Sequence, residues 1–259
     1  RGSPRPPATR PTGVGLMSRS SAPRAIAPRP PMLDLTGSDA HDIVYTARSE
    51  TRSAADPVGI YVPYRVARIY FVDARAHPSP LVESMAMASI LPLPPTYRPQ
   101  LPNIAAKALS EAQLETLTYA GQAFLRDLPG RFTATTDGMT LSEDNAGSVF
   151  RTGYFLGDGT GAGKGRQVAA VIMDQWVRGN RRHIWISKSA SLLEDARRDW
   201  SALGGVGLDI MPLTDWALGS LVTMAEGIVF ATYATLRSSR PEKGSRLDQL
   251  IVWVNGINA

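Results

Sequence analysis

Gly157-Asp158-Gly159-Thr160-Gly161-Ala162-Gly163-Lys164-Gly165 is the stretch that decides the fold, and it lies between an apolar run and a helix-like run. Its glycines allow successive backbone N–H groups to turn toward anionic oxygens, and the positive end of a following helix adds to that attraction. The single lysine supplies a mobile cation for the outer phosphates. The stretch therefore predicts a phosphate-binding turn whose favoured ligand is a nucleoside triphosphate.

The spacing departs from the usual pattern, which is Gly, four residues, Gly-Lys and then Ser or Thr. Asp158 stands at the first glycine position, and Gly165 stands where a hydroxyl would bind Mg²⁺. Gly157-x-Gly159-x-x-Ala162 also fits the dinucleotide fingerprint, which needs an acidic residue about 20 positions later. The next predicted strand ends without one. A triphosphate is favoured over a dinucleotide, and a plain glycine-rich turn remains the third interpretation.

Composition bounds the rest of the chain. With 259 residues, 43% of them hydrophobic, it can bury a sizeable core in one or two domains. The absence of cysteine excludes disulfides and thiolate chemistry and fits a reducing cytoplasm. No apolar stretch approaches the roughly 20 residues of a membrane span. The three histidines, His41, His77 and His183, lack ligand spacing, so no protein metal site is predicted.

The net charge of +5 comes from the N-terminal segment. Residues 1–33 hold six arginines, eight prolines and no acidic residue, so the remainder carries a net charge of −1. Such a composition predicts a disordered arm, because it cannot bury enough apolar surface to become ordered. The arm is either a solvated linker or a basic segment that touches nucleic acid. Since the chain begins at Arg1 and not at Met, we expect it to be a piece of a longer protein.

Residues 34–105 are predicted to form a β-containing lead-in region. Short β-prone runs at 60–62 and 66–72 are punctuated by prolines. The second run ends in Asp73, which we interpret as a turn residue and not as a ligand of Mg²⁺.

From residue 106 the pattern changes to helices and then to alternating elements. Ser110 caps a predicted helix whose apolar residues recur at 114, 117, 120 and 124, and residues 129–148 are predicted to be a polar loop. Strands are predicted at 153–156, 183–187, 208–213 and 228–232. Helices are predicted from the glycine-rich turn to Gly179, from Ser191 to Gly204, and over 246–254. The second is expected to be capped by Ser191, since Glu194 follows it by three residues.

This alternation predicts an α/β fold with a parallel sheet, in which the phosphate-binding turn follows the first strand. Ligands bind at the carboxyl edge of such a sheet. The same edge should carry two polar groups, which are Ser187, Lys188 and Ser189 after one strand and Thr232, Tyr233 and Thr235 after another. Small donors, a lysine and an aromatic ring suit a nucleic-acid backbone, although the hydroxyls could instead cap the helices that follow.

These residues resemble a known family. The resemblance rests on Leu109-Ser110-x-Ala112-Gln113-Leu114-Glu115, on 157–166, on Trp185-Ile186-Ser187-x-Ser189 with Asp195-Ala196-x-Arg198-Asp199, and on Phe230-Ala231-Thr232-Tyr233-x-x-Leu236. His77-Pro78, 81–84 and 86–89 extend it, so that it covers roughly residues 60–254. The chain is similar to the strawberry notch family of helicase superfamily 2. In that family a glycine after the lysine is usual, so Gly165 becomes a match.

The resemblance implies an ATP-dependent helicase or translocase built from two RecA-like lobes. Gln113 would correspond to the adenine-reading glutamine, Lys164 to the catalytic phosphate lysine, 187–189 to motif Ia and 232–235 to motif Ib. The cofactors would be ATP and Mg²⁺, and the polymer DNA in preference to RNA. The implied nucleotide contacts are Gln113, Asp158, Gly159, Thr160, Gly161, Ala162, Gly163, Lys164, Gly165 and Arg166.

The chain contains only some of the motifs of this family. After Leu247-Asp248-Gln249-Leu250 the family continues into a strand that ends in the Asp-Glu pair that holds Mg²⁺, and no such pair follows the glycine-rich turn here. We therefore expect residues 106–259 to be an incomplete first lobe, with the second lobe missing. This piece should bind nucleotide without hydrolysing it. The alternatives are a non-catalytic docking or regulatory module and, less favoured, a dinucleotide-binding oxidoreductase domain. The compositional bias and the resemblance suggest a bacterial cytoplasmic protein.

Overall fold

The computed structural model describes residues 39–48, 59–88, 92–136 and 140–256. The arm predicted for residues 1–33 lies outside these ranges. Everything below concerns the described residues.

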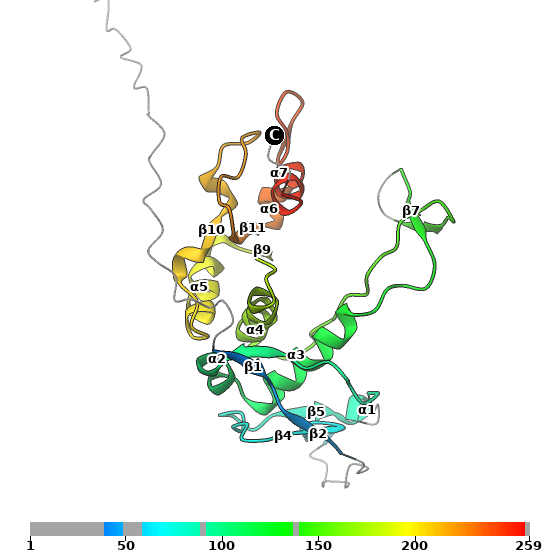
Figure 1. The fold of residues 1–259 in the computed structure, drawn as a ribbon, viewed down its shortest axis with the longest axis vertical. Helices are drawn as coiled ribbons and strands as arrows, with labels where there is room; N and C mark the ends of the chain where they lie inside the picture. Colours follow the sequence, from blue (N-terminus) through cyan, green and yellow to red (C-terminus); the bar gives the residue numbers. More distant parts are fainter. Residues whose placement is uncertain (1–38, 49–58, 89–91, 137–139, 257–259) are drawn as a thin grey trace, which may run out of the picture. The chain divides into compact units, whose positions relative to one another are not determined.

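A parallel three-stranded sheet forms the centre of the second half of the chain (Figure 1). Its strands are β9 (Arg182–Ser187), β10 (Ile210–Pro212) and β11 (Gly227–Thr232), in the order β10-β11-β9. Along β11, Ile228 and Phe230 enter one apolar core while Val229 and Ala231 enter another. Both faces of the sheet are therefore covered, as parallel sheets require. The predicted α/β class and the strands at 183–187, 208–213 and 228–232 are confirmed.

Helices cover the two faces of this sheet. The first core joins it to α4 (Lys164–Val177) and α5 (Leu193–Ser201), whose indole rings, Trp176 and Trp200, are fully buried with centroids 5.4 Å apart. The second core joins it to α7 (Arg246–Val254). The shorter connecting elements are η1 (Ala190–Leu192), η2 (Gly207–Asp209), η3 (Leu213–Asp215), α6 (Tyr233–Leu236), β12 (Ser239–Arg240) and β13 (Gly244–Ser245).

The lead-in region is built from short antiparallel pairs, in keeping with its β-prone runs. The pairs are β1 (Ala40–Asp42) with β6 (Gln100–Pro102), β2 (Tyr45–Ala47) with β4 (Ile69–Phe71), and β3 (Tyr61–Pro63) with β5 (Val82–Ser84). Two short helices accompany them, α1 (Met85–Ala88) and α2 (Asn103–Ala108).

The lead-in and the later α/β part share one hydrophobic core. Ile69, Phe71 and Leu101 are buried in the same cluster as Leu117 and Trp176. Burial of this kind stabilises both parts at once, because each supplies apolar surface that the other removes from water. The domain boundary proposed at residues 105 and 106 stays a prediction.

The predicted helix beginning at Ser110 is α3 (Glu111–Phe124), and its expected apolar face is buried at Leu114, Leu117 and Ala120. The predicted loop at 129–148 is wrong, because it contains the hairpin of β7 (Phe132–Ala134) and β8 (Leu141–Glu143). These strands are only three residues each, too short to show an apolar alternation from which a strand could be predicted.

Two further predictions are wrong. Residues 153–156 form no strand, since none of the described strands pairs with them, and Phe155 is 90% exposed. An apolar run becomes a strand only where a neighbour completes its ladder. Ser191 does not cap α5. Instead, Ser189 accepts a hydrogen bond from the Ser191 N–H (3.3 Å), and the short η1 turn precedes the helix.

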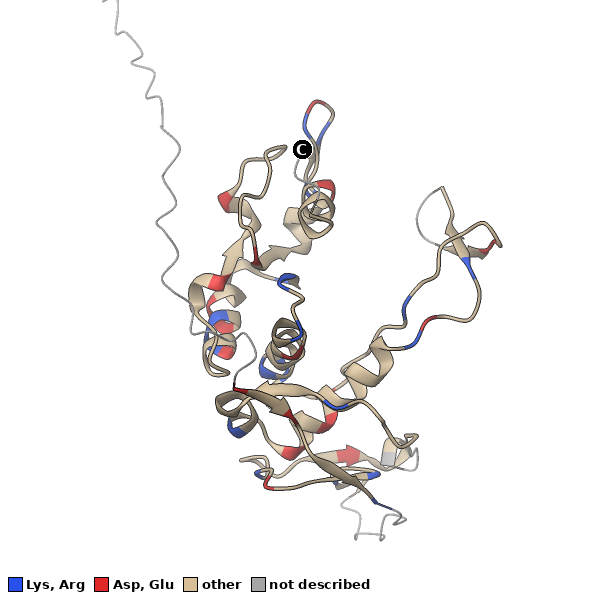
Figure 2. Ribbon diagram, in the orientation of Figure 1, with Lys and Arg blue, Asp and Glu red and all other residues tan. Residues whose placement is uncertain are grey.

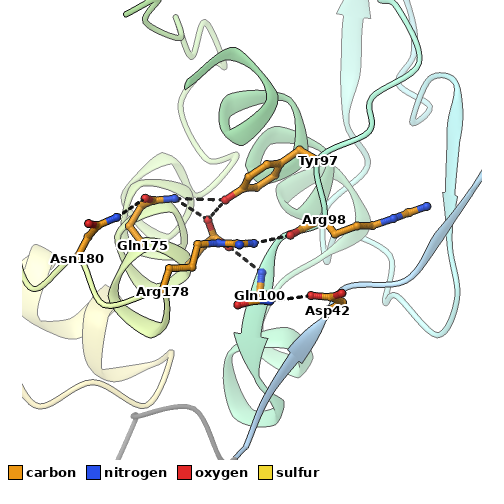
Figure 3. Close-up of polar contacts among 8 residues, drawn as sticks. Asp42, Tyr97, Arg98, Gln100, Gln175, Arg178 and Asn180 are labelled. Atoms are coloured by element: carbon orange, nitrogen blue, oxygen red, sulfur yellow. Dashed lines mark hydrogen bonds and ion pairs between the residues drawn. The ribbon is translucent and has the colours of Figure 1, made fainter. Parts of the chain in front are cut away.

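A buried carboxylate, Asp174, fastens α4 to the lead-in. Figure 3 shows its partners Tyr97, Gln100, Gln175 and Arg178. Asp174 accepts hydrogen bonds from the Gln100 N–H (2.7 Å), the Arg178 Nε (3.1 Å) and the Gln175 Nε2 (2.9 Å). It also accepts one from the Tyr97 hydroxyl. Burial and the neighbouring carboxylate raise the pKa of Tyr97 above its ordinary value, so this hydroxyl remains a donor.

We expect Asp174→Ala to lower the free energy of unfolding by about 3 kcal/mol, because it leaves several buried donors without an acceptor. Urea denaturation measures the loss. The matched control is Asp195→Asn, which removes an exposed carboxylate paired with Arg198 on α5 and should change stability by less than about 1 kcal/mol. Equal effects of the two substitutions would contradict the anchoring role of Asp174.

Candidate functional site

The glycine-rich stretch forms an exposed turn that leads into α4. Gly161 and Gly163 adopt positive φ values of 95° and 78°, a region that side chains other than glycine rarely adopt. Gly163 is the N-cap of α4. Because α4 has 14 residues, its first-turn N–H groups and its dipole make this end favourable for anions.

Lys164, the first residue of α4, folds back over the turn. Its Nζ donates hydrogen bonds to the carbonyl oxygens of Asp158 and Gly159, each at 2.8 Å. Lys164 therefore contacts the backbone of the glycine-rich turn that precedes it. An ammonium group has three donors, so one remains beyond these two bonds.

Gln113 ties the start of α3 to the turn. Its Oε1 accepts a hydrogen bond from the Ser110 N–H (3.0 Å), and its Nε2 donates to the Ala162 carbonyl (3.3 Å). The side chain is only 6% exposed. Resemblance alone assigned Gln113 to the nucleotide site, and the structure places it against the turn although 50 residues separate the two in sequence.

Gln167, on the first turn of α4, has no role in the sequence interpretation. Its Nε2 donates to the Asp158 carboxylate (2.9 Å) and to the Ala162 carbonyl (3.2 Å). Its Oε1 and the neighbouring Arg166 Nε are buried and have no hydrogen-bond partner among the described residues. Buried polar atoms without partners call for an explanation. No sequence pattern singles out Gln167, because its place at the site depends on its contacts with Asp158 and Ala162.

The two polar groups predicted for the edge of the sheet lie together. Thr232 at the end of β11 pairs in parallel register with Ser187 at the end of β9. The Thr232 hydroxyl accepts a hydrogen bond from the Thr235 N–H (3.1 Å), so it caps α6, just as Ser189 caps η1. Lys188 and Tyr233 are exposed, and Tyr233 reaches 63%. These two are the side chains most available to a ligand.

Two searches of the described residues gave negative findings. No three His, Asp or Glu side chains gather where they could hold a metal ion within those ranges. Among the helices of the described part, none has both the length and the apolar character needed to cross a bilayer.

A glycine-rich turn whose lysine opens a helix beside a parallel sheet defines the class of P-loop NTPases. The family described as P-loop containing NTP hydrolase pore-1 matches residues 76–258. The chain belongs to the strawberry notch family within this class.

Three relatives illustrate the similarity. Protein FORGETTER 1 of Arabidopsis thaliana is 37% identical over 183 residues, which cover 68% of this chain and 13% of the relative. Protein strawberry notch of Drosophila melanogaster is 29% identical over 225 residues, which cover 82% of this chain and 12% of the relative. Protein strawberry notch homolog 2 of Homo sapiens is 35% identical over 182 residues, which cover 69% of this chain and 12% of the relative. No solved structure matches the chain.

The chain therefore spans about an eighth of the length of these curated relatives. All three come from eukaryotes, so they give no support to the bacterial origin expected from composition.

Gly163→Ala should destabilise the protein by about 1–2 kcal/mol, because alanine resists the left-handed conformation. Its Cβ would also lie 2.5 Å from Gln113 Nε2. Thermal denaturation measures the effect. Gly159→Ala is the matched control, since a Cβ at Gly159 would meet nothing within 4 Å. If both variants have the melting temperature of the wild type, Gln113 does not approach the turn as closely as described.

Proposed function

We propose that this chain is the ATP-binding part of a superfamily 2 helicase or translocase that acts on nucleic acid, DNA in preference to RNA. The observation that carries the proposal is the position of Lys164, whose cation lies over a glycine-rich turn at the positive end of α4. The Arg166 Nε beside the turn supports it, because this buried donor has no partner among the described residues and a phosphate oxygen could accept its hydrogen bond.

In this proposal the triphosphate lies against the turn and the first-turn amides of α4. Lys164 exchanges its two carbonyl partners for phosphate oxygens, and such charge-assisted bonds are about twice as strong as neutral ones. Bound Mg²⁺ would supply neutralisation of the phosphate charge. Gln113 would read the base after releasing the Ala162 carbonyl. The proposed nucleotide contacts remain Gln113, Asp158, Gly159, Thr160, Gly161, Ala162, Gly163, Lys164, Gly165 and Arg166.

Nucleic acid would bind at the carboxyl edge of the sheet. Lys188 would contact a phosphate and the exposed Tyr233 ring would stack on a base, while Ser187, Ser189, Thr232 and Thr235 shape the edge. Hydrolysis coupled to movement along the polymer, with a second lobe, is proposed for the whole protein, in the cytoplasm. Residues 1–259 by themselves should bind ATP without turnover, since they contain no Asp-Glu pair after the turn.

A titration of wild type and Lys164→Ala with ATP tests the proposal. We expect Lys164→Ala to weaken ATP binding by roughly 10-fold to 100-fold, the effect of losing a hydrogen bond from a charged donor. Lys188→Ala is the matched control and should bind ATP as the wild type does. Equal affinities of wild type and Lys164→Ala would remove the nucleotide assignment and leave the docking or regulatory module. Binding of a reduced nicotinamide, seen as enhanced fluorescence, would favour the dinucleotide alternative.

Nucleic-acid binding is tested separately with a labelled single-stranded oligonucleotide. Lys188→Ala should lower the salt dependence of affinity by about one released ion, and Tyr233→Ala should weaken binding by the roughly 1–3 kcal/mol of a stacked base. Lys107→Ala, on the exposed side of α2, is the control that should change neither. If the three variants bind alike, the polymer does not contact this edge.

A further inference from the structure

Gly165 leaves a gap that another residue fills. The usual P-loop has a hydroxyl side chain at this position to hold Mg²⁺. A Cβ added to Gly165 would overlap the Oδ2 atom of Asp199 and would lie 3.3 Å from its Cγ. The carboxylate of α5 therefore occupies the space that a side chain at position 165 would take. An oxygen ligand is present there although the hydroxyl is not.

The surroundings of Asp199 leave its oxygens only loosely engaged. The side chain is 13% exposed, and its ion pairs are long, 3.7 Å from Oδ1 to Arg166 and 3.6 Å from Oδ2 to Arg198. Both distances exceed that of a charge-assisted hydrogen bond. Figure 2 shows that α5 carries both acidic and basic residues, which are Glu194, Asp195, Arg197, Arg198 and Asp199.

Arg166 and Arg198, at 3.7 Å and 3.6 Å, offset only part of the repulsion that the Asp199 carboxylate exerts on a triphosphate. Like charges repel, and the repulsion is strongest where the carboxylate is partly removed from water. A divalent cation between the two turns repulsion into attraction. Mg²⁺ is commonly held by one or two carboxylates together with substrate phosphates, so a cage of several protein ligands is not needed.

On the basis of the proposed ATP binding, we propose that Asp199 replaces the missing hydroxyl at position 165 and holds the Mg²⁺ that accompanies the triphosphate. The competing role is purely structural, in which Asp199 only positions Arg166. The two roles differ in one measurable respect, which is whether the contribution of Asp199 depends on the metal.

The experiment compares ATP affinity in Mg²⁺ with ATP affinity in EDTA, by titration of the full 259-residue chain. Wild type should bind the Mg²⁺ complex more tightly. Asp199→Asn preserves shape and should weaken binding in Mg²⁺ by about 10-fold or more, the effect of losing an oxygen that supports a metal. In EDTA its affinity should equal or exceed that of wild type. Asp195→Asn is the matched control, because Asp195 lies on the same helix and also pairs with Arg198.

A reciprocal exchange makes the test sharper. The double variant Gly165→Ser with Asp199→Ala supplies a hydroxyl and removes the carboxylate that would clash with it. It should regain the preference for Mg²⁺ that Asp199→Ala alone has lost. Circular dichroism of each variant confirms that α4 and α5 remain folded.

The outcomes separate the two proposals. If Asp199→Asn loses ATP affinity equally in Mg²⁺ and in EDTA, Asp199 only positions Arg166 and the inference is overturned. The inference is also overturned if Asp199→Asn binds ATP as tightly as wild type does. Wild type that binds ATP equally with and without metal also overturns it while leaving the nucleotide site intact. Wild type that binds no ATP under either condition rejects the proposed function itself.

Discussion

The buried carboxylate of Asp174 fixes helix α4, and the candidate site depends on the position of that helix. Gln100 and Tyr97 of the lead-in donate hydrogen bonds to it, and so do Gln175 of α4 and Arg178, the C-cap of that helix. A buried charge must be satisfied by hydrogen bonds or it costs several kcal/mol, so the arrangement tolerates little displacement. The far end of the same helix carries Lys164, Arg166 and Gln167. The polar anchor thus sets where these groups lie.

Close approach of backbone and side chains gives the site its second constraint. Gln113 reaches the turn because Gly163 has no Cβ, and Asp199 reaches the start of α4 because Gly165 has none. A third glycine, Gly121 of α3, admits the Tyr97 ring in the same way. Tyr97 therefore contacts α3 through Gly121 and α4 through Asp174, and α3 carries Gln113. The glycines at these places act by the absence of a side chain, each bringing one polar or aromatic group into position.

Local patterns in the sequence were enough to predict α3, α4, α7 and the parallel strands, because each has a strong apolar period or a capping residue. They were not enough for the segment 153–156, whose apolar residues look like a strand but pair with no described neighbour. Nor could they show the hairpin at 132–143, whose strands are three residues each. At the site, the turn and Lys164 were evident from spacing, and resemblance indicated Gln113. Gln167 depends on its contacts with the turn. The function proposed for Asp199 depends on a contact between α5 and the start of α4. No local pattern encodes either.

The shared core of the lead-in and the α/β part has a consequence for how this protein loses its structure. Ile69, Phe71 and Leu101 pack in the cluster that also holds Trp176 and the inner face of the sheet. Separation of the two parts would expose apolar surface to water. We therefore expect them to unfold cooperatively in one transition. A substitution that destabilises a strand of the lead-in would then also destabilise the glycine-rich turn, and heat or denaturant would unfold both regions together.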